Sequence, residues 1–116
     1  MKNKQLVNQR NGYIVSTQIE YADTWLSRLV GLLADSSLKK HEALWLSPCK
    51  SVHTIGMRFS IDVVFLDKYN RIKKLGESVK PFRFCKAAKG TYSVLELPSG
   101  IIQSAGLQRG DKLLLQ

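Results

Sequence analysis

The segment from Met57 to Leu66 alternates apolar with other side chains, and it constrains the fold more than any other part of the chain. Side chains alternate across a strand, so an extended segment here has one continuous apolar face. Its members are Met57, Phe59, Ile61, Val63 and Phe65. The opposite face starts polar and ends with Val64 and Leu66. We therefore expect a strand whose first half is covered on one side and whose second half is covered on both.

Asp62 lies where those two halves meet. A carboxylate at the edge of a core loses solvation, and a hydrogen-bond donor or a cation must offset that cost. Arg58 is four residues away, which is about 13 Å along a strand and too far for a direct pair. The donor to Asp62 must therefore come from elsewhere in the chain. Gly56 predicts a bend that carries the preceding loop over the top of the sheet.

Turn and cap residues divide the rest of the chain into short elements. Asn11-Gly12 predicts a type I′ hairpin whose first strand lies on an edge. A helix is expected over 24–33, and a second over 99–105, capped by Ser99 and followed by Gly106. Further strands are expected at Ala43 to Leu46, Arg71 to Leu75, Tyr92 to Leu97 and Lys112 to Gln116.

These elements predict one α+β domain over residues 1–116, with a mostly antiparallel, strongly bent or barrel-like β-sheet and two short helices. The hydrophobic fraction of 44% is that of a globular protein. No apolar run approaches the roughly 20 residues that cross a bilayer, and MKNKQLVNQ has no hydrophobic signal segment. We expect a cytoplasmic protein in which Cys49 and Cys85 stay reduced, a disulfide between them being the less favoured alternative.

Several separated motifs resemble one protein family. They are C-x-x-V-H-T-x-G-M-R-F-x-I-D-V-V-F-L-D from Cys49, R-x-x-G-L-L from Arg28, V-L-E-L-P-S-G from Val94 and G-L-x-x-G-D from Gly106. Together they are similar to domain of unknown function 192, also called uncharacterised protein family 0127. The resemblance implies a compact, mostly antiparallel β domain with short helices and no established activity. Many relatives carry a tryptophan-methionine pair where this chain has Val52-His53-Thr54, so a role for His53 does not carry over.

Polar side chains around the central strand form the favoured candidate site, for a small polar or anionic ligand. His53 and Arg28 would donate to the ligand and Asp62 would orient them, beside an apolar wall. There are two structural alternatives. Arg28 is a solvated helix side chain, and the carboxylates of Asp62 and Glu96 each bond a backbone amide or an arginine. No cofactor is expected. The candidate residues are Arg28, Trp45, His53, Thr54, Met57, Asp62 and Glu96.

Enzymatic alternatives use the same region. Cys49 with His53 has the residue types of a thiol nucleophile and its base. Asp62 and Glu96, each beside apolar neighbours, could divide acid and base roles. A zinc site would need Cys49, His53, Cys85 and His41, whose spacings match no standard finger, so no metal is expected.

Positive charge is concentrated between residues 68 and 89, which hold eight basic side chains and one acidic one. With a net charge of +9, the chain attracts phosphates, and the interleaved aromatic residues could stack on bases. Nucleic-acid binding is therefore an alternative function. The structural alternative is that Lys and Arg side chains on the hairpin strands keep exposed sheet edges from pairing with other chains. Its candidate residues are Arg71, Lys73, Lys74, Arg83, Lys86 and Lys89.

Overall fold

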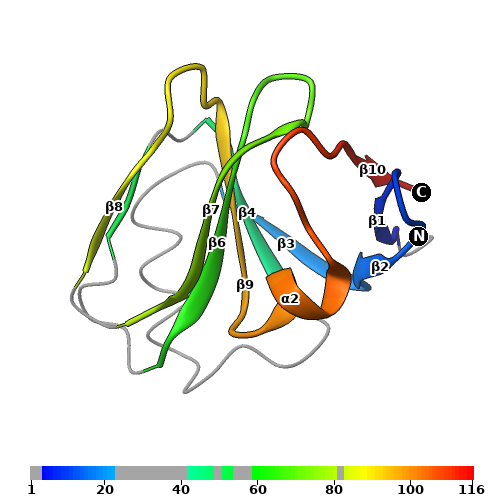
Figure 1. The fold of residues 1–116 in the computed structure, drawn as a ribbon, viewed down its shortest axis with the longest axis horizontal. Helices are drawn as coiled ribbons and strands as arrows, with labels where there is room; N and C mark the ends of the chain where they lie inside the picture. Colours follow the sequence, from blue (N-terminus) through cyan, green and yellow to red (C-terminus); the bar gives the residue numbers. More distant parts are fainter. Residues whose placement is uncertain (1–3, 23–41, 49–50, 54–58, 81–82) are drawn as a thin grey trace.

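A computed structural model describes residues 4–22, 42–48, 51–53, 59–80 and 83–116, and the structural statements below concern these residues. They form ten strands and one short helix, α2 (Figure 1). The strands are β1 (Leu6–Asn8), β2 (Ile14–Ser16), β3 (Gln18–Ala22), β4 (Glu42–Leu46), β5 (Ser51–His53), β6 (Ile61–Leu66), β7 (Ile72–Val79), β8 (Phe84–Lys86), β9 (Ser93–Pro98) and β10 (Leu113–Leu115). The helix α2 spans Ile101–Ala105. The helix predicted over 24–33 lies outside the described residues.

The strands divide among three sheets, with orders β10-β1-β2, β3-β4-β9-β6-β7 and β5-β8. In the five-stranded sheet, β3 pairs with β4 in parallel, and the other pairs are antiparallel. The sheets are thus mixed, and the described strands do not form the one barrel-like sheet that the sequence predicted. Figure 1 shows the β5-β8 pair on one side of the five-stranded sheet and α2 with the three-stranded sheet on the other.

Two apolar layers cover the faces of the five-stranded sheet. The helix-side layer contains Leu6, Val15, Ala43, Trp45, Val64, Leu66, Ile72, Leu95, Leu97, Ile102, Ala105, Leu107 and Leu113. The β8-side layer contains Leu44, Leu46, Ile61, Val63, Phe65 and Val94, with Cys85 and Ala87 of the β8 region packed against it. Strand β6 contributes alternate residues to both layers and all six are buried. The predicted covering of its second half on both faces is confirmed.

The N-terminal hairpin forms as predicted, but its turn and its place in the sheet differ. Gly12 has φ of 72°, whereas Asn11 has no positive φ, so the turn is not type I′. Strand β1 lies between β2 and β10 and is buried, so the predicted edge position is wrong. The strand from the far end of the chain pairs with β1 and removes that edge.

Helix α2 begins without the predicted serine cap. Its N-cap residue is Gly100, whose backbone lies in the left-handed region. A glycine has no side chain, so the N-cap residue makes no side-chain hydrogen bond to the first turn. The hydroxyl of Ser99 instead lies 2.5 Å from that of Ser78 on β7. Gly106 ends the helix with φ of 62°, as predicted. Among the described residues, no helix is long and apolar enough to cross a membrane.

Candidate functional site

Asp62 is fully buried on β6 and accepts three backbone hydrogen bonds. Oδ1 accepts from the Ser78 amide at 2.8 Å, and Oδ2 accepts from the amides of Gly100 and Ile102 at 3.1 and 2.8 Å. The expectation that the donor comes from elsewhere in the chain is confirmed. The carboxylate satisfies the first-turn amides of α2, which have no partners inside the helix. Asp62 therefore has a structural role in joining β6, β7 and α2.

Local irregularity in β7 creates the first of these bonds. The register between β6 and β7 shifts between Ile61 and Val63, and Ser78 has φ of 47°. A bulge leaves an amide without its ladder partner. The side chain of Asp62 supplies that partner, which explains why a carboxylate is accommodated inside an apolar strand.

Glu96 is fully buried on β9 but lies on the other face of the sheet from Asp62. It is directly opposite Val63 on β6 and Leu44 on β4, both in the β8-side layer. Asp62 is opposite Leu97, which belongs to the helix-side layer. Directly paired residues share a face of the sheet. The structure therefore does not bring Asp62 and Glu96 together as an acid/base pair.

Trp45 lies on β4 in the helix-side layer, on the same face as Asp62. It is buried, and its ring stacks on that of Tyr21 with the centroids 6.1 Å apart. Trp45 and Glu96 therefore cannot line one pocket on a single face of the sheet. The indole packs in the core of the helix-side layer.

The remaining members of the predicted ligand site fall largely outside the described residues. This holds for Arg28, Thr54 and Met57, and for Cys49 of the thiol alternative. His53 is placed by its backbone only, opposite Phe84 in the β5-β8 pair. The roles proposed for these side chains stay predictions. Among the described residues, no group of three or more His, Cys, Asp or Glu side chains could hold a metal ion.

The basic residues between 68 and 89 divide between two regions. Lys74 donates to the carbonyl of Lys86 at 2.6 Å and lies over the ring of Phe65, toward β8. Arg71 and Lys73 instead face an open pocket on the far side of the β6-β7 hairpin. The side chains of Arg83, Lys86 and Lys89 are exposed. The predicted nucleic-acid residues therefore do not form one continuous row on β7.

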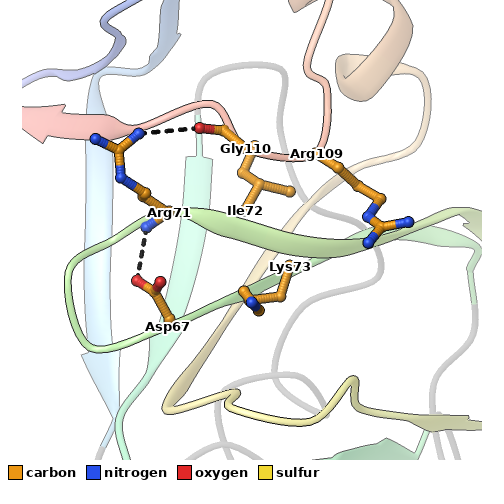
Figure 2. A pocket seen from close by; sticks show the side chains of 6 residues that line it. All are labelled: Asp67, Arg71, Ile72, Lys73, Arg109 and Gly110. Atoms are coloured by element: carbon orange, nitrogen blue, oxygen red, sulfur yellow. Dashed lines mark hydrogen bonds between the residues drawn. The ribbon is translucent and has the colours of Figure 1, made fainter.

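We call the concavity beside this hairpin the basic pocket, and its volume is about 400 Å³ (Figure 2). Figure 2 shows that its residues come from the β6-β7 hairpin and from the turn before β10. The basic pocket is lined by Asp67, Arg71, Ile72, Lys73, Arg109 and Gly110. Three formal positive charges thus face one carboxylate.

Hydrogen bonds fix the hairpin side of the basic pocket. Asp67 Oδ1 accepts from the amides of Tyr69 and Arg71 at 2.8 and 3.0 Å. The guanidinium of Arg71 donates to the Gly110 carbonyl at 3.2 Å, which ties the hairpin to the turn before β10. The carboxylate is therefore partly committed to its own turn.

Lys73 reaches the basic pocket through a second irregularity in β7. Phe65 is opposite Lys74, and Leu66 is opposite Ile72, so Lys73 is the extra residue of a bulge. Bulges re-aim side chains. The Lys73 side chain lies near Gly90. A Cβ atom added at Gly90 would be 3.8 Å from the Cε atom of Lys73. Within the described part of the chain, neither the Lys73 side chain nor the Arg109 side chain has a hydrogen bond or an ion pair.

Sequence patterns alone did not identify Arg109. It lies in the block from Gly106 to Asp111, whose resemblance to the family gave no role to Arg109. Lys112 was also missed; it bridges Arg71 in an antiparallel pairing. The only available signal was the number of basic residues flanking the Gly-Asp turn, which does not indicate which hairpin they approach.

Asp111 itself holds the two ends of the chain together. Its buried carboxylate accepts from Asn8 Nδ2 at 2.9 Å, from Arg10 Nε at 2.8 Å and from the Gln108 amide at 3.0 Å. Burial raises the pKa of the Asp111 carboxyl, but these hydrogen bonds and the charge of Arg10 outweigh it and leave that pKa below its ordinary value. Asp111 is therefore a structural anchor.

Cys85 is a free, half-buried thiol on β8. Burial raises its pKa, and the nearby charge of Lys74 lowers it by less. A thiol with a raised pKa carries little thiolate at neutral pH. Cys85 is therefore suited to packing against the β8-side layer rather than to nucleophilic chemistry.

Curated relatives resemble almost the whole chain. A protein from Pyrococcus furiosus, described as a UPF0127 protein, is 27% identical over 113 residues, which cover 93% of this chain and 95% of that protein. A UPF0127 protein from Thermococcus sibiricus is also 27% identical, over 93% of this chain and 72% of that protein. These descriptions name a family and no activity.

Two crystal structures share the fold. A protein of unknown function from Novosphingobium aromaticivorans has a TM-score of 0.80 and 19% identity, covering 97% of this chain and 83% of that one. A Sinorhizobium meliloti protein, provisionally described as a transcription regulator, has a TM-score of 0.81 and 18% identity, covering 97% and 92%. At this identity the likeness shows the fold alone.

The family model DUF192, described as an uncharacterized ACR, matches residues 6–115. The match includes the strand that carries Asp62 and the turn that carries Arg109 and Asp111. Because it extends over nearly the whole sequence, the chain belongs to the DUF192 family of uncharacterised proteins.

Proposed function

We propose that this protein binds a small anionic ligand in the basic pocket. The observation that carries the proposal is the approach of Arg71, Lys73 and Arg109 from two separate segments to one concavity. A volume of about 400 Å³ is within the range of small-ligand sites. The proposal keeps the predicted ligand class and moves the site away from the central strand.

Electrostatics favour an anion at this position. Asp67 already accepts two amide hydrogen bonds, and Arg71 is bonded to the Gly110 carbonyl. Lys73 and Arg109, by contrast, keep their donors available among the described residues. Charge-assisted hydrogen bonds from such donors to phosphate or carboxylate oxygens are short and strong. An oxyanion between Lys73 and Arg109 would offset the repulsion between the like charges.

The region around Asp62 supports ligand binding less well. Both of its oxygens are used by backbone amides, and Glu96 lies on the opposite face of the sheet. Three of the roughly four acceptor positions of the Asp62 carboxylate are thus used by amides of β7 and the α2 segment, which leaves little capacity to orient a further side chain. The contribution of His53 and Arg28 to a second site stays a prediction, as does the Cys49 and His53 thiol mechanism.

Titration with inorganic phosphate, followed by amide chemical shifts, tests the proposal. We expect the largest shifts at residues 71–73 and 109–110. A Lys73→Gln/Arg109→Gln variant should weaken phosphate binding at least about tenfold, the equivalent of one lost charge-assisted hydrogen bond.

The matched control is Lys4→Gln/Lys86→Gln, which removes the same charge from exposed positions outside the basic pocket. It should bind phosphate within about twofold of the unmodified protein, since distant surface charges are screened. Equal weakening in both double variants would show that net charge alone attracts phosphate, and would refute a site.

A further inference from the structure

Positive charge continues beyond the basic pocket along the paired segments that line it. Arg71 and Lys112 are directly opposite each other in an isolated antiparallel bridge. Like charges in this arrangement repel each other. Lys68 and Lys89 are exposed on the neighbouring β6-β7 and β8-β9 connections. The cationic surface is therefore longer than one small anion requires.

Two exposed tyrosines belong to the same connections. Tyr69 is 63% exposed in the turn whose ends, Asp67 and Arg71, line the basic pocket. Tyr92 is 49% exposed and directly precedes β9, two residues after Gly90, which lies beside the Lys73 side chain. The Tyr92 amide donates to the Leu66 carbonyl at 2.8 Å, which fixes this connection next to the hairpin.

Both tyrosine rings have surface that is open to solvent. The residues that flank Tyr92, Thr91 and Ser93, are buried, whereas the ring of Tyr92 is half exposed. Lys68 Nζ lies 5.3 Å from the centroid of the Tyr69 ring, which places a cation over one face of that ring. Two aromatic rings are thus held near a row of cations, with area free for stacking.

From this combination we infer that the anionic ligand of the basic pocket is the backbone of single-stranded nucleic acid. The inference rests on the proposed anion binding and adds the identity of the ligand. A phosphate would occupy the basic pocket between Lys73 and Arg109, and neighbouring bases would stack on Tyr69 and Tyr92. Single strands offer both groups at once, because their bases are not enclosed in a duplex.

The form of the surface favours a single strand over a duplex. The described part of this surface contains no helix that could enter a major groove; α2, with five residues, is held by Asp62. The aromatic rings lie on hairpin connections, where unpaired bases can reach them. Recognition by stacking also tolerates any base, so weak sequence preference is expected.

Fluorescence anisotropy with labelled single-stranded octamers, of deoxythymidine and of uridine, tests the inference. Tyr69→Ala/Tyr92→Ala should weaken octamer binding at least about tenfold, since stacking on each ring contributes to affinity. The same variant should bind inorganic phosphate as the unmodified protein does. Tyr13→Ala removes another exposed tyrosine, away from the basic pocket, and should change neither affinity.

Salt dependence adds a second measurement. If three cations neutralise phosphates, the logarithm of the association constant should fall with a slope of about −2 against the logarithm of salt concentration. Lys73→Gln/Arg109→Gln should reduce that slope by about 1.4 and also weaken phosphate binding. The control Lys4→Gln/Lys86→Gln should leave the slope unchanged.

The outcomes separate the two proposals. If phosphate shifts residues 71–73 but the octamers bind no more tightly than phosphate, the inference fails and the proposed function stands. If a duplex of the same length binds as tightly as the octamers, or if the tyrosine variant binds them unchanged, the inference also fails. If neither phosphate nor octamers bind, the proposed function itself is wrong.

Discussion

The carboxylate of Asp62 accepts a 2.8 Å hydrogen bond from the amide of Ile102, forty residues further along the chain. The bond connects the most buried strand of the five-stranded sheet to the first turn of α2. Together with the Ser78 amide, it lets a charged side chain lie inside an apolar layer. Asp62 thus anchors the start of α2, and the chain continues from this helix to Arg109 and Gly110 of the basic pocket.

Replacing Asp62 should destabilise the fold strongly. Asp62→Ala leaves three amides without partners, and we expect a loss of about 3–5 kcal/mol in the free energy of unfolding. Asp62→Asn keeps one acceptor oxygen and should lose less. Urea unfolding followed by circular dichroism measures both. Asp67→Ala, which removes a half-buried turn carboxylate, is the control and should lose about 1 kcal/mol. A comparable loss in Asp62→Ala and Asp67→Ala would contradict this role.

Stability should depend on pH through Asp111. Its pKa is lower in the folded protein than the ordinary value of 3.8. The stabilisation is therefore fully present above about pH 4 and is lost as pH falls through the lowered pKa. Asp111→Asn should be less stable at pH 6 and should lose less stability between pH 4 and pH 2. Parallel curves for the two proteins over that range would exclude the linkage.

Removing the charge of Lys112 should stabilise the protein. It lies directly opposite Arg71, and relief of the repulsion should add about 0.2–0.5 kcal/mol at low salt for Lys112→Gln. Thermal unfolding at low salt and at 1 M salt measures the effect, which should vanish where charges are screened. Lys86→Gln is the control, since Lys86 is opposite Ser51. A gain that persists in 1 M salt would have another cause.

Alkylation of Cys85 should be slow at neutral pH. Its burial-raised pKa leaves less thiolate than an ordinary cysteine has, so iodoacetamide should react at least about threefold more slowly at pH 8. Lys74→Gln removes the charge that lowers this pKa, and should slow the reaction further. Peptide mass spectrometry separates Cys85 from Cys49. Faster alkylation in Lys74→Gln would show that access, rather than pKa, controls the rate.

Local sequence patterns predicted most of the central sheet. Alternation placed Val63 and Phe65 on one face of β6, and Val64 and Leu66 on the other, as the structure has them. Leu95 and Glu96, which are neighbours on β9, likewise lie on opposite faces. These predictions succeed because side-chain direction along a strand depends only on the neighbouring residues.

The placement of functional side chains depended on contacts that local patterns do not contain. Asp62 and Glu96 both lie among apolar residues in the sequence, and only the register between β6 and β9 puts them on opposite faces. A shift of one residue would have reversed this result. The candidate pair could therefore not be excluded before the strands were paired.

The sequence by itself determined most of the strands, though not β3, β5 or β8, together with the burial of Asp62 and its need for a donor. These follow from the order of apolar and polar side chains. Only the tertiary structure decided which amides bond Asp62, that β10 pairs with β1, and that Arg109 and Lys73 line the same pocket. The physical reason is distance along the chain. Pairing of remote segments depends on register, bulges and loop closure, which no local pattern of residues specifies.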